Sequence, residues 1–200
     1  MSWIKTIPYG EASGKLKNIY NKIKGPDNHI DNILTIHSLR PHTLTGHMSL
    51  YKNVLHHSGN TLPNWFLEAL GSYVSYLNRC NYCYAHHTEG MKRFLGDEQK
   101  TTTIKNAIEN NTLNIVFTPK ELVALNYARK LTRSLSKIEK NDFIKMKSAG
   151  YQDGEILEIN QVVSYFNYAN RTVLGLGVSL DGEILGLSPK NKDSDHWQHE

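Results

Sequence analysis

The amino-acid sequence predicts an all-α protein. In most segments apolar residues recur at the three- and four-residue spacing of a helix face, and glycine, proline or capping residues separate these segments. No segment of convincing length alternates apolar and polar residues, apart from a short piece near 113–117. With 200 residues, 39% of them hydrophobic, the chain is long enough for one ordinary domain with a buried core.

The first 60 residues contain two apolar stripes. Residues 11–24 form the first predicted helix, and Gly25-Pro26 ends it. Its apolar face consists of Leu16, Ile19, Tyr20 and Ile23. A short segment from Ile30 to Leu39 ends at Pro41. The second stripe, which Gly59 closes, consists of Leu44, Met48, Tyr51 and Leu55.

Two helices are predicted in the middle of the chain. Residues 63–77 begin at Pro63, which is tolerated in a first helical turn because its missing N–H has no partner there. Asn78 is expected to cap a helix over residues 79–95, and Gly96 to end it.

Three helices follow in the last third. Thr118 and Glu121 have the spacing of a capping box, with Pro119 at the first helical position. The face behind it consists of Leu122, Leu125, Ala128 and Leu131. Residues 140–149 form a short helix, and Asp153 is expected to cap a long one that Gly175 and Gly177 break. The apolar residues of this long helix are Ile156, Ile159, Val163, Phe166 and Leu174.

Charge and hydropathy exclude several classes of function. The formal net charge is +4, and the basic residues are scattered, so we expect no nucleic-acid partner. No apolar run approaches the roughly 18 residues that cross a bilayer, so we expect no membrane association. The first 15 residues lack the apolar region of a secretory signal, which favours a cytoplasmic location.

The chain has two cysteines, Cys80 and Cys83, in a single C-x-x-C. Two cysteines in 200 residues do not make a disulfide scaffold of the secreted kind. In a reducing cytosol, a lone C-x-x-C indicates redox chemistry or half of a metal site.

His87 falls on the same helical face as both cysteines, whereas His86 is expected to point away. The pair also lies in a first helical turn, where the positive end of the helix dipole stabilises a thiolate. His87 could take a thiol proton or pair with a thiolate. Glu68, among apolar neighbours twelve residues before Cys80, is either a solvated outlier or a functional base.

Three other interpretations of the cysteines stay open. They could be small buried hydrophobic residues. They could bind zinc with His87, with Glu68 or another histidine as fourth ligand, although no second C-x-x-C exists. They could belong to a thioredoxin-like fold, but the βαβ context of that fold is missing.

The spacing of Glu68, Cys80, Cys83 and His87 resembles the active-site signature of the alkyl hydroperoxidase D and carboxymuconolactone decarboxylase superfamily. The chain is most similar to its peroxidase-related branch. The stretches that carry the resemblance are Ile7-Pro8, residues 12–16 (ASGKL), 37–41 (HSLRP), 80–87 (CNYCYAHH) and 167–180 (NYANRTVLGLGVSL). The resemblance runs from about residue 5 to residue 182.

The resemblance implies one alkyl hydroperoxidase D-like helical domain. We expect a helical arm over residues 1–60, the core over 61–187 and a polar tail over 188–200. The family is usually a homo-oligomer, often a trimer or hexamer, and its known reductant is a lipoyl group on a carrier protein. No cofactor is expected.

The resemblance also implies a role for each site residue. Cys83 would attack a hydroperoxide, and Cys80, expected to be the more exposed thiol, would resolve the sulfenic acid into a disulfide. Glu68 and His87 would relay the proton. The prototype has a histidine just before its second cysteine, and Tyr82 occupies that place here, so the relay would rest on Glu68 and His87 alone.

The predicted function is therefore thiol-dependent reduction of hydroperoxides, or a disulfide reductase activity. Two alternatives remain: a non-redox family member such as a lactone decarboxylase, and a helical oligomer without enzymatic activity that senses redox state or binds metal. Elsewhere, Asn167, Asn170 and Arg171 share one face of the last helix, where a buried polar or intersubunit network is expected.

Overall fold

The computed structural model describes residues 2–188, and over that range it is all-helical, as predicted. Its helices are α1 (Gly14–Ile23), α2 (Asn32–Thr35), α3 (Pro41–Tyr51), α4 (Asn64–Leu77), α5 (Asn81–Leu95), α6 (Glu98–Glu109), α7 (Pro119–Arg133), α8 (Lys140–Ser148) and α9 (Asp153–Gly175). A π-helix, Lys52–His56, continues α3. None of these helices is long and apolar enough to cross a membrane. Apart from Ser188, the predicted polar tail lies outside the described residues.

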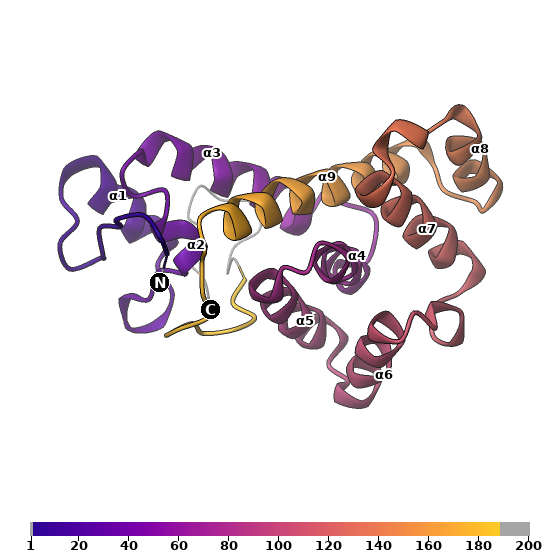
Figure 1. Ribbon diagram of the computed structural model, residues 1–200, viewed down its shortest axis with the longest axis horizontal. Coiled ribbons are helices and arrows are strands. Elements are labelled where there is room, and N and C mark those ends of the chain that lie inside the picture. The colour runs from indigo at the N-terminus through magenta and orange to yellow at the C-terminus, as the bar shows by residue number, and fades with distance from the viewer. Residues whose placement is uncertain (1, 189–200) are drawn as a thin grey trace.

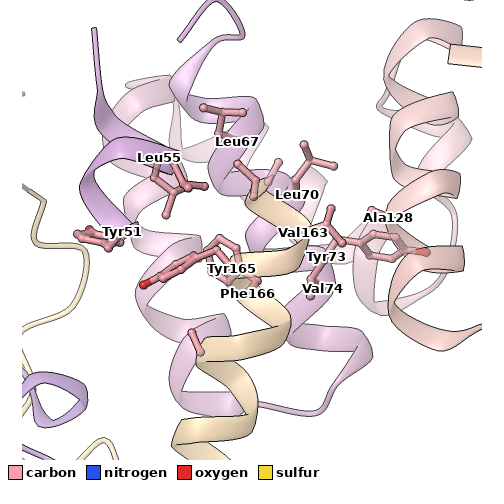
Figure 2. Close-up of a cluster of buried hydrophobic side chains, with 14 of the residues drawn as sticks. Tyr51, Leu55, Leu67, Leu70, Tyr73, Val74, Ala128, Val163, Tyr165 and Phe166 are labelled. Carbon is pink, nitrogen blue, oxygen red and sulfur yellow. The ribbon is translucent and has the colours of Figure 1, made fainter. Parts of the chain in front are cut away.

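Helix α4 lies at the centre of the molecule. It forms an antiparallel hairpin with α5 and packs against α9 and α7 (Figure 1). The largest apolar cluster lies between α4 and α9 and continues into the end of α3 (Figure 2). Its members include Tyr51, Leu55, Leu67, Leu70, Val163 and Phe166. Tyr51, Leu55, Val163 and Phe166 belong to predicted stripes, whereas Leu174 of the last stripe is exposed.

The contact between α4 and α9 depends on a glycine. A Cβ atom on Gly71 would lie 2.1 Å from Cζ of Phe166, which is well inside van der Waals contact. The missing side chain therefore lets the Phe166 ring lie directly on the α4 backbone. This ring also packs edge-on against His87, with centroids 4.4 Å apart, and so links the core to the site.

The start of α5 differs from the prediction. Asn78 does not cap α5; it ends α4, and its side chain donates hydrogen bonds to Asn167 and Asn170 on α9. Arg79 then has a left-handed backbone (φ 58°), so the helix restarts only at Asn81. Cys80 is consequently the N-cap residue, and Cys83 lies in the first turn.

Other boundaries were predicted with mixed success. The capping box of Thr118 and Glu121 is present, and Gly96 ends α5 in a left-handed conformation. The sequence analysis missed α6, whose apolar stripe is short and whose Asp97 cap accepts a hydrogen bond from Lys100. The possible strand near 113–117 is a 3₁₀ turn, and Gln152 rather than Asp153 caps α9.

After α9 the chain turns back as an irregular C-terminal segment, residues 176–188, which runs beside α2 towards α5 (Figure 1). The Asn32 side chain donates hydrogen bonds to the carbonyls of Ser179 and Asp181. Gly177 has φ +63° and lies against the Trp3 ring, which fixes the turn that directs the segment. The fold thus brings residues near 30, 85 and 183 together.

Candidate active site

Glu68 and His87 form a hydrogen-bonded carboxylate–imidazole pair between α4 and α5. Oε2 of Glu68 lies 2.6 Å from Nδ1 of His87, so the two residues expected to relay a proton are in direct contact. The Glu68 side chain is 3% exposed, and His56 lies 3.8 Å from its other oxygen. A carboxylate at Nδ1 orients the imidazole and leaves Nε2 free to exchange a proton with another group.

Gly90 makes room for this carboxylate. A Cβ atom there would lie 3.1 Å from Cδ of Glu68 and 3.2 Å from both carboxylate oxygens. Because Gly90 is one turn after His87 on α5, the helix backbone confines Glu68 on the side next to its partner.

Both cysteines are reduced and buried. The expectation that Cys80 is the more exposed thiol is wrong, because its exposed fraction is 0% against 3% for Cys83. Cys80 is covered by Ile36, Val173 and Val178, whereas Cys83 lines a cavity. The position of Cys80 at the helix start did not predict its exposure, because α2 and the end of α9 pack over that end of α5.

The two thiols titrate as a pair. A hydrogen bond from the Cys83 thiol lowers the pKa of Cys80, and burial raises the pKa of Cys83 well above its ordinary value. A hydrogen bond with Asn170 acts in the opposite direction on the pKa of Cys83. Of the two thiols, Cys80 is therefore the one that loses its proton more readily.

The cavity beside Cys83 has a volume of about 50 Å³. That is room for roughly four water molecules. Glu68 and His87 line it together with Cys83, so the structure brings three of the four predicted site residues to one space. The remaining wall is largely aromatic and aliphatic and includes Tyr51, Tyr165, Met48 and Leu187.

A second histidine–carboxylate pair, which the sequence analysis missed, lies beside the same cavity. Nε2 of His86 is 2.8 Å from Oε2 of Glu183, and Tyr82 donates a 2.8 Å hydrogen bond to the same oxygen. His86 lines the cavity, so the expectation that it points away is wrong. Its spacing of three residues from Cys83 already places it within about 60° of that cysteine on the helix. Glu183 could not have been found from local spacing, because it lies in the C-terminal segment.

The polar face predicted on α9 is a buried network around the end of α4. Asn170 is fully buried, donates to Ser75 and accepts from Asn78, while Arg171 donates to Asn167. Because Asn170 also contacts Cys83, the network holds the thiol end of α5 against α9.

Comparison with solved structures gives several matches to this fold. An uncharacterized peroxidase-related protein from Silicibacter is 24% identical with a TM-score of 0.68, over 76% of this chain and 78% of that one. A second, from Ralstonia eutropha and described as an alkylhydroperoxidase D core, is 16% identical with a TM-score of 0.74, over 92% and 97% of the two chains.

A debrominase solved in complex with 2,3,4-tribromopyrrole is 15% identical with a TM-score of 0.65 and covers 84% of each chain. No protein-family model and no curated protein matches the sequence. At these identities the matches establish architecture rather than activity. The chain has the alkylhydroperoxidase D fold, which is the fold that the resemblance of its sequence implied.

Proposed function

We propose that this protein reduces small hydroperoxides through the Cys80–Cys83 pair, with Glu68 and His87 as the proton relay. One observation carries the proposal: a thiol and a hydrogen-bonded histidine–carboxylate pair line the same cavity, and the second thiol lies one helical turn before the first. Thiol peroxidase chemistry requires these three elements: a nucleophile, a proton relay and a resolving thiol.

Access decides which sulfur reacts. Cys80 loses its proton more readily than Cys83, but it does not line the cavity and is fully buried. Transfer of the shared proton from Cys83 to Cys80 puts the negative charge on the sulfur that a peroxide can reach. The free-energy cost of that transfer follows from the difference between the pKa values of Cys83 and Cys80. Binding of a polar peroxide beside Cys83 lowers this cost.

The reaction then balances in two steps. The Cys83 thiolate attacks one peroxide oxygen, the O–O bond breaks, and the departing alkoxide or hydroxide takes a proton from the relay, which leaves Cys83 as a sulfenic acid. Cys80, which holds the proton that it took from Cys83, passes that proton to the departing hydroxide as its sulfur attacks the sulfenic acid, so water leaves and a disulfide forms. An external dithiol, which we propose to be lipoyl-like, reduces the disulfide and completes the cycle.

The cavity favours small substrates. Its 50 Å³ accommodates hydrogen peroxide or a short organic hydroperoxide, whereas a lipid hydroperoxide would require the surrounding helices to move. Because one protein of this fold is a debrominase, tribromopyrrole belongs among the compounds tested as alternative oxidants of the thiol pair.

We further propose that the protein works as a homo-oligomer, a trimer or hexamer. Helix α9 exposes the apolar side chains of Leu157, Tyr168 and Leu174, which contact between chains would cover. Size-exclusion chromatography with light scattering tests this; a monomer at all protein concentrations contradicts it.

The cysteine roles are tested with two single variants. Cys83→Ser should abolish peroxide consumption, while Cys80→Ser should complete one stoichiometric turnover and leave a sulfenic acid that dimedone traps. In the parent protein, intact-mass analysis after alkylation should show loss of two thiols without dimer formation. If Cys80→Ser is inactive and Cys83→Ser still reacts, the assignment is inverted; if both variants react like the parent, the pair is not the site.

A further inference from the structure

A group of metal-ligand side chains lies beside the thiol cavity but outside the proposed thiol chemistry. One ligand atom each of His29, Asp31 and Glu183 lies within 4.8 Å of the other two. Over residues 2–188 these are the only His, Cys, Asp or Glu side chains that converge so closely in a group of three, and neither cysteine belongs to the group. The zinc site considered for the cysteines therefore has no geometric support, whereas this second position has.

The chain supplies these side chains from separate segments. His29 and Asp31 are two residues apart, and Nε2 of His29 lies 3.1 Å from Oδ1 of Asp31. Glu183 comes from the C-terminal segment, and its side chain is 1% exposed. The fold thus closes a loop of about 150 residues to bring the two carboxylates together.

His86 lies next to this group on α5 but does not belong to it. Its Nε2 is 2.8 Å from Oε2 of Glu183, whereas Nε2 of His29 is 3.1 Å from Oδ1 of Asp31. Tetrahedral zinc with bonds of about 2.0–2.1 Å separates neighbouring ligand atoms by roughly 3.3 Å. The 3.1 Å between His29 and Asp31 is close to that value, and the three ligand atoms of His29, Asp31 and Glu183 all lie within 4.8 Å of one another, so small side-chain movements would let them bind one ion.

The two imidazole nitrogens point to a ligand. Nε2 of His29 and Nε2 of His86 are buried, and within the described residues neither makes a hydrogen bond of good geometry, although each lies close to a carboxylate. A buried ring nitrogen at a carboxylate without a well-directed hydrogen bond is an unusual arrangement in a folded protein. A cation held by His29, Asp31 and Glu183 would use the lone pair on Nε2 of His29.

The surroundings of Glu183 resemble the outer shell of a metal site. The Asn32 backbone N–H donates to one carboxylate oxygen at 2.7 Å, and the Tyr82 hydroxyl donates to the other at 2.8 Å. Such hydrogen bonds orient a ligating carboxylate and are typical around bound metals. Among the described residues no lysine or arginine neutralises Glu183.

We propose that His29, Asp31 and Glu183 bind one divalent transition-metal ion, with zinc, completed by water, the best match to one imidazole and two carboxylates. The ion would join the loop before α2 to the C-terminal segment, and so fix the segment that carries Leu187 over the thiol cavity. This proposal does not depend on the peroxidase proposal, because none of its ligands is a thiol.

Zinc binding is tested in the Cys80→Ser/Cys83→Ser background, which removes the thiols as competing ligands. Calorimetric titration of chelator-treated protein with zinc chloride should give one ion per chain. His29→Ala and Glu183→Gln should each weaken binding by at least about 10–100-fold. His42→Ala, at an exposed histidine, is the matched control and should bind like the background protein.

Two further readouts separate the outcomes. Cobalt substituted for zinc should give visible d–d bands without the thiolate charge-transfer band in the near ultraviolet, and bound zinc should slow amide exchange in residues 178–188. No binding at micromolar zinc in the folded double-cysteine background overturns the proposal. So does binding that His29→Ala and Glu183→Gln both leave unchanged while their circular dichroism shows an intact fold.

Discussion

Gly90→Ala should lower the activity strongly and leave the free energy of unfolding almost unchanged, because the added methyl group acts on one functional side chain. The new Cβ would lie 3.1 Å from Cδ of Glu68, so the carboxylate must retreat by a few tenths of an ångström. Any retreat from α5 stretches the 2.6 Å contact with His87, which is on the same helix.

The effects on folding nearly cancel. Alanine in a helix interior is more favourable than glycine by about 1 kcal/mol. Weakening a hydrogen bond to a charged, buried carboxylate costs at most about 1.5–3 kcal/mol, and a displacement this small costs a fraction of that. The free energy of unfolding should therefore change by no more than about 1 kcal/mol.

Activity should fall much further. General acid–base catalysis contributes about 10²–10⁴-fold, so partial loss of the relay should slow peroxide consumption by about tenfold or more. The assay is peroxide consumption with excess dithiol, alongside urea unfolding of the same preparations. Gly46→Ala is the matched control, since nothing lies within 4 Å of its Cβ position on α3.

A double-mutant cycle shows whether the methyl group acts through Glu68. If it does, Gly90→Ala should add little to the loss already caused by Glu68→Gln, because the relay can be removed only once. Independent, multiplicative losses would refute the reasoning, and so would parent-like activity in a correctly folded Gly90→Ala protein.

Two other predictions concern stability. Gly71→Ala should destabilise the protein by about 1–3 kcal/mol or more in urea unfolding, since its Cβ would lie 2.1 Å from Phe166; an unchanged midpoint would contradict the contact. Burial, reinforced by His37, lowers the pKa of His47 to about 3, so below about pH 6.5 the unfolded chain binds a proton that the folded one does not. Stability should then fall by up to ~1.4 kcal/mol per pH unit as the pH drops from about 6.5 towards 3, and His47→Gln should flatten that slope.

The sequence was sufficient for what depends on neighbouring residues. The apolar stripe that ends with Leu55 and the capping box at Thr118 both reappear in the structure, because periodicity and capping are set within a few turns. The contact between Glu68 and His87 was also predicted, although from a resemblance: spacing alone does not show that α4 and α5 pair antiparallel.

What failed depends on segments distant in the chain. Cys80 is buried by residues at the end of α9, about 95 residues later in the chain. No pattern near Cys80 in the sequence predicts this burial. The prediction that His86 points away failed for a different reason. Its angle from Cys83 on the helix could be calculated from the sequence, but its partner Glu183 lies in an irregular segment that has no periodicity to predict it. Helix α6 was missed because its polar sequence leaves only a narrow stripe around Ile104 and Ile108.

Tyr82 provides the last test, because it occupies the place where the prototype of this fold has a histidine. Burial raises the pKa of its hydroxyl well above the ordinary value, so Tyr82 cannot carry protons near neutral pH. Its hydroxyl instead accepts from the backbone N–H of Ile33 at 3.2 Å and donates to Glu183, which makes it an anchor for the C-terminal segment.

Tyr82→Phe should therefore leave the reaction of Cys83 with peroxide within a few-fold of the parent, while amide exchange in residues 178–188 accelerates. The hydrogen bond that it removes serves a buried carboxylate and is worth about 1.5–3 kcal/mol, which corresponds to roughly 10–150-fold faster exchange where local opening limits it. Stopped-flow peroxide reduction and exchange mass spectrometry measure the two effects on one preparation. Loss of the peroxide reaction with unchanged exchange would show that Tyr82 belongs to the relay. The reasoning that makes Glu68 and His87 the complete relay would then be wrong.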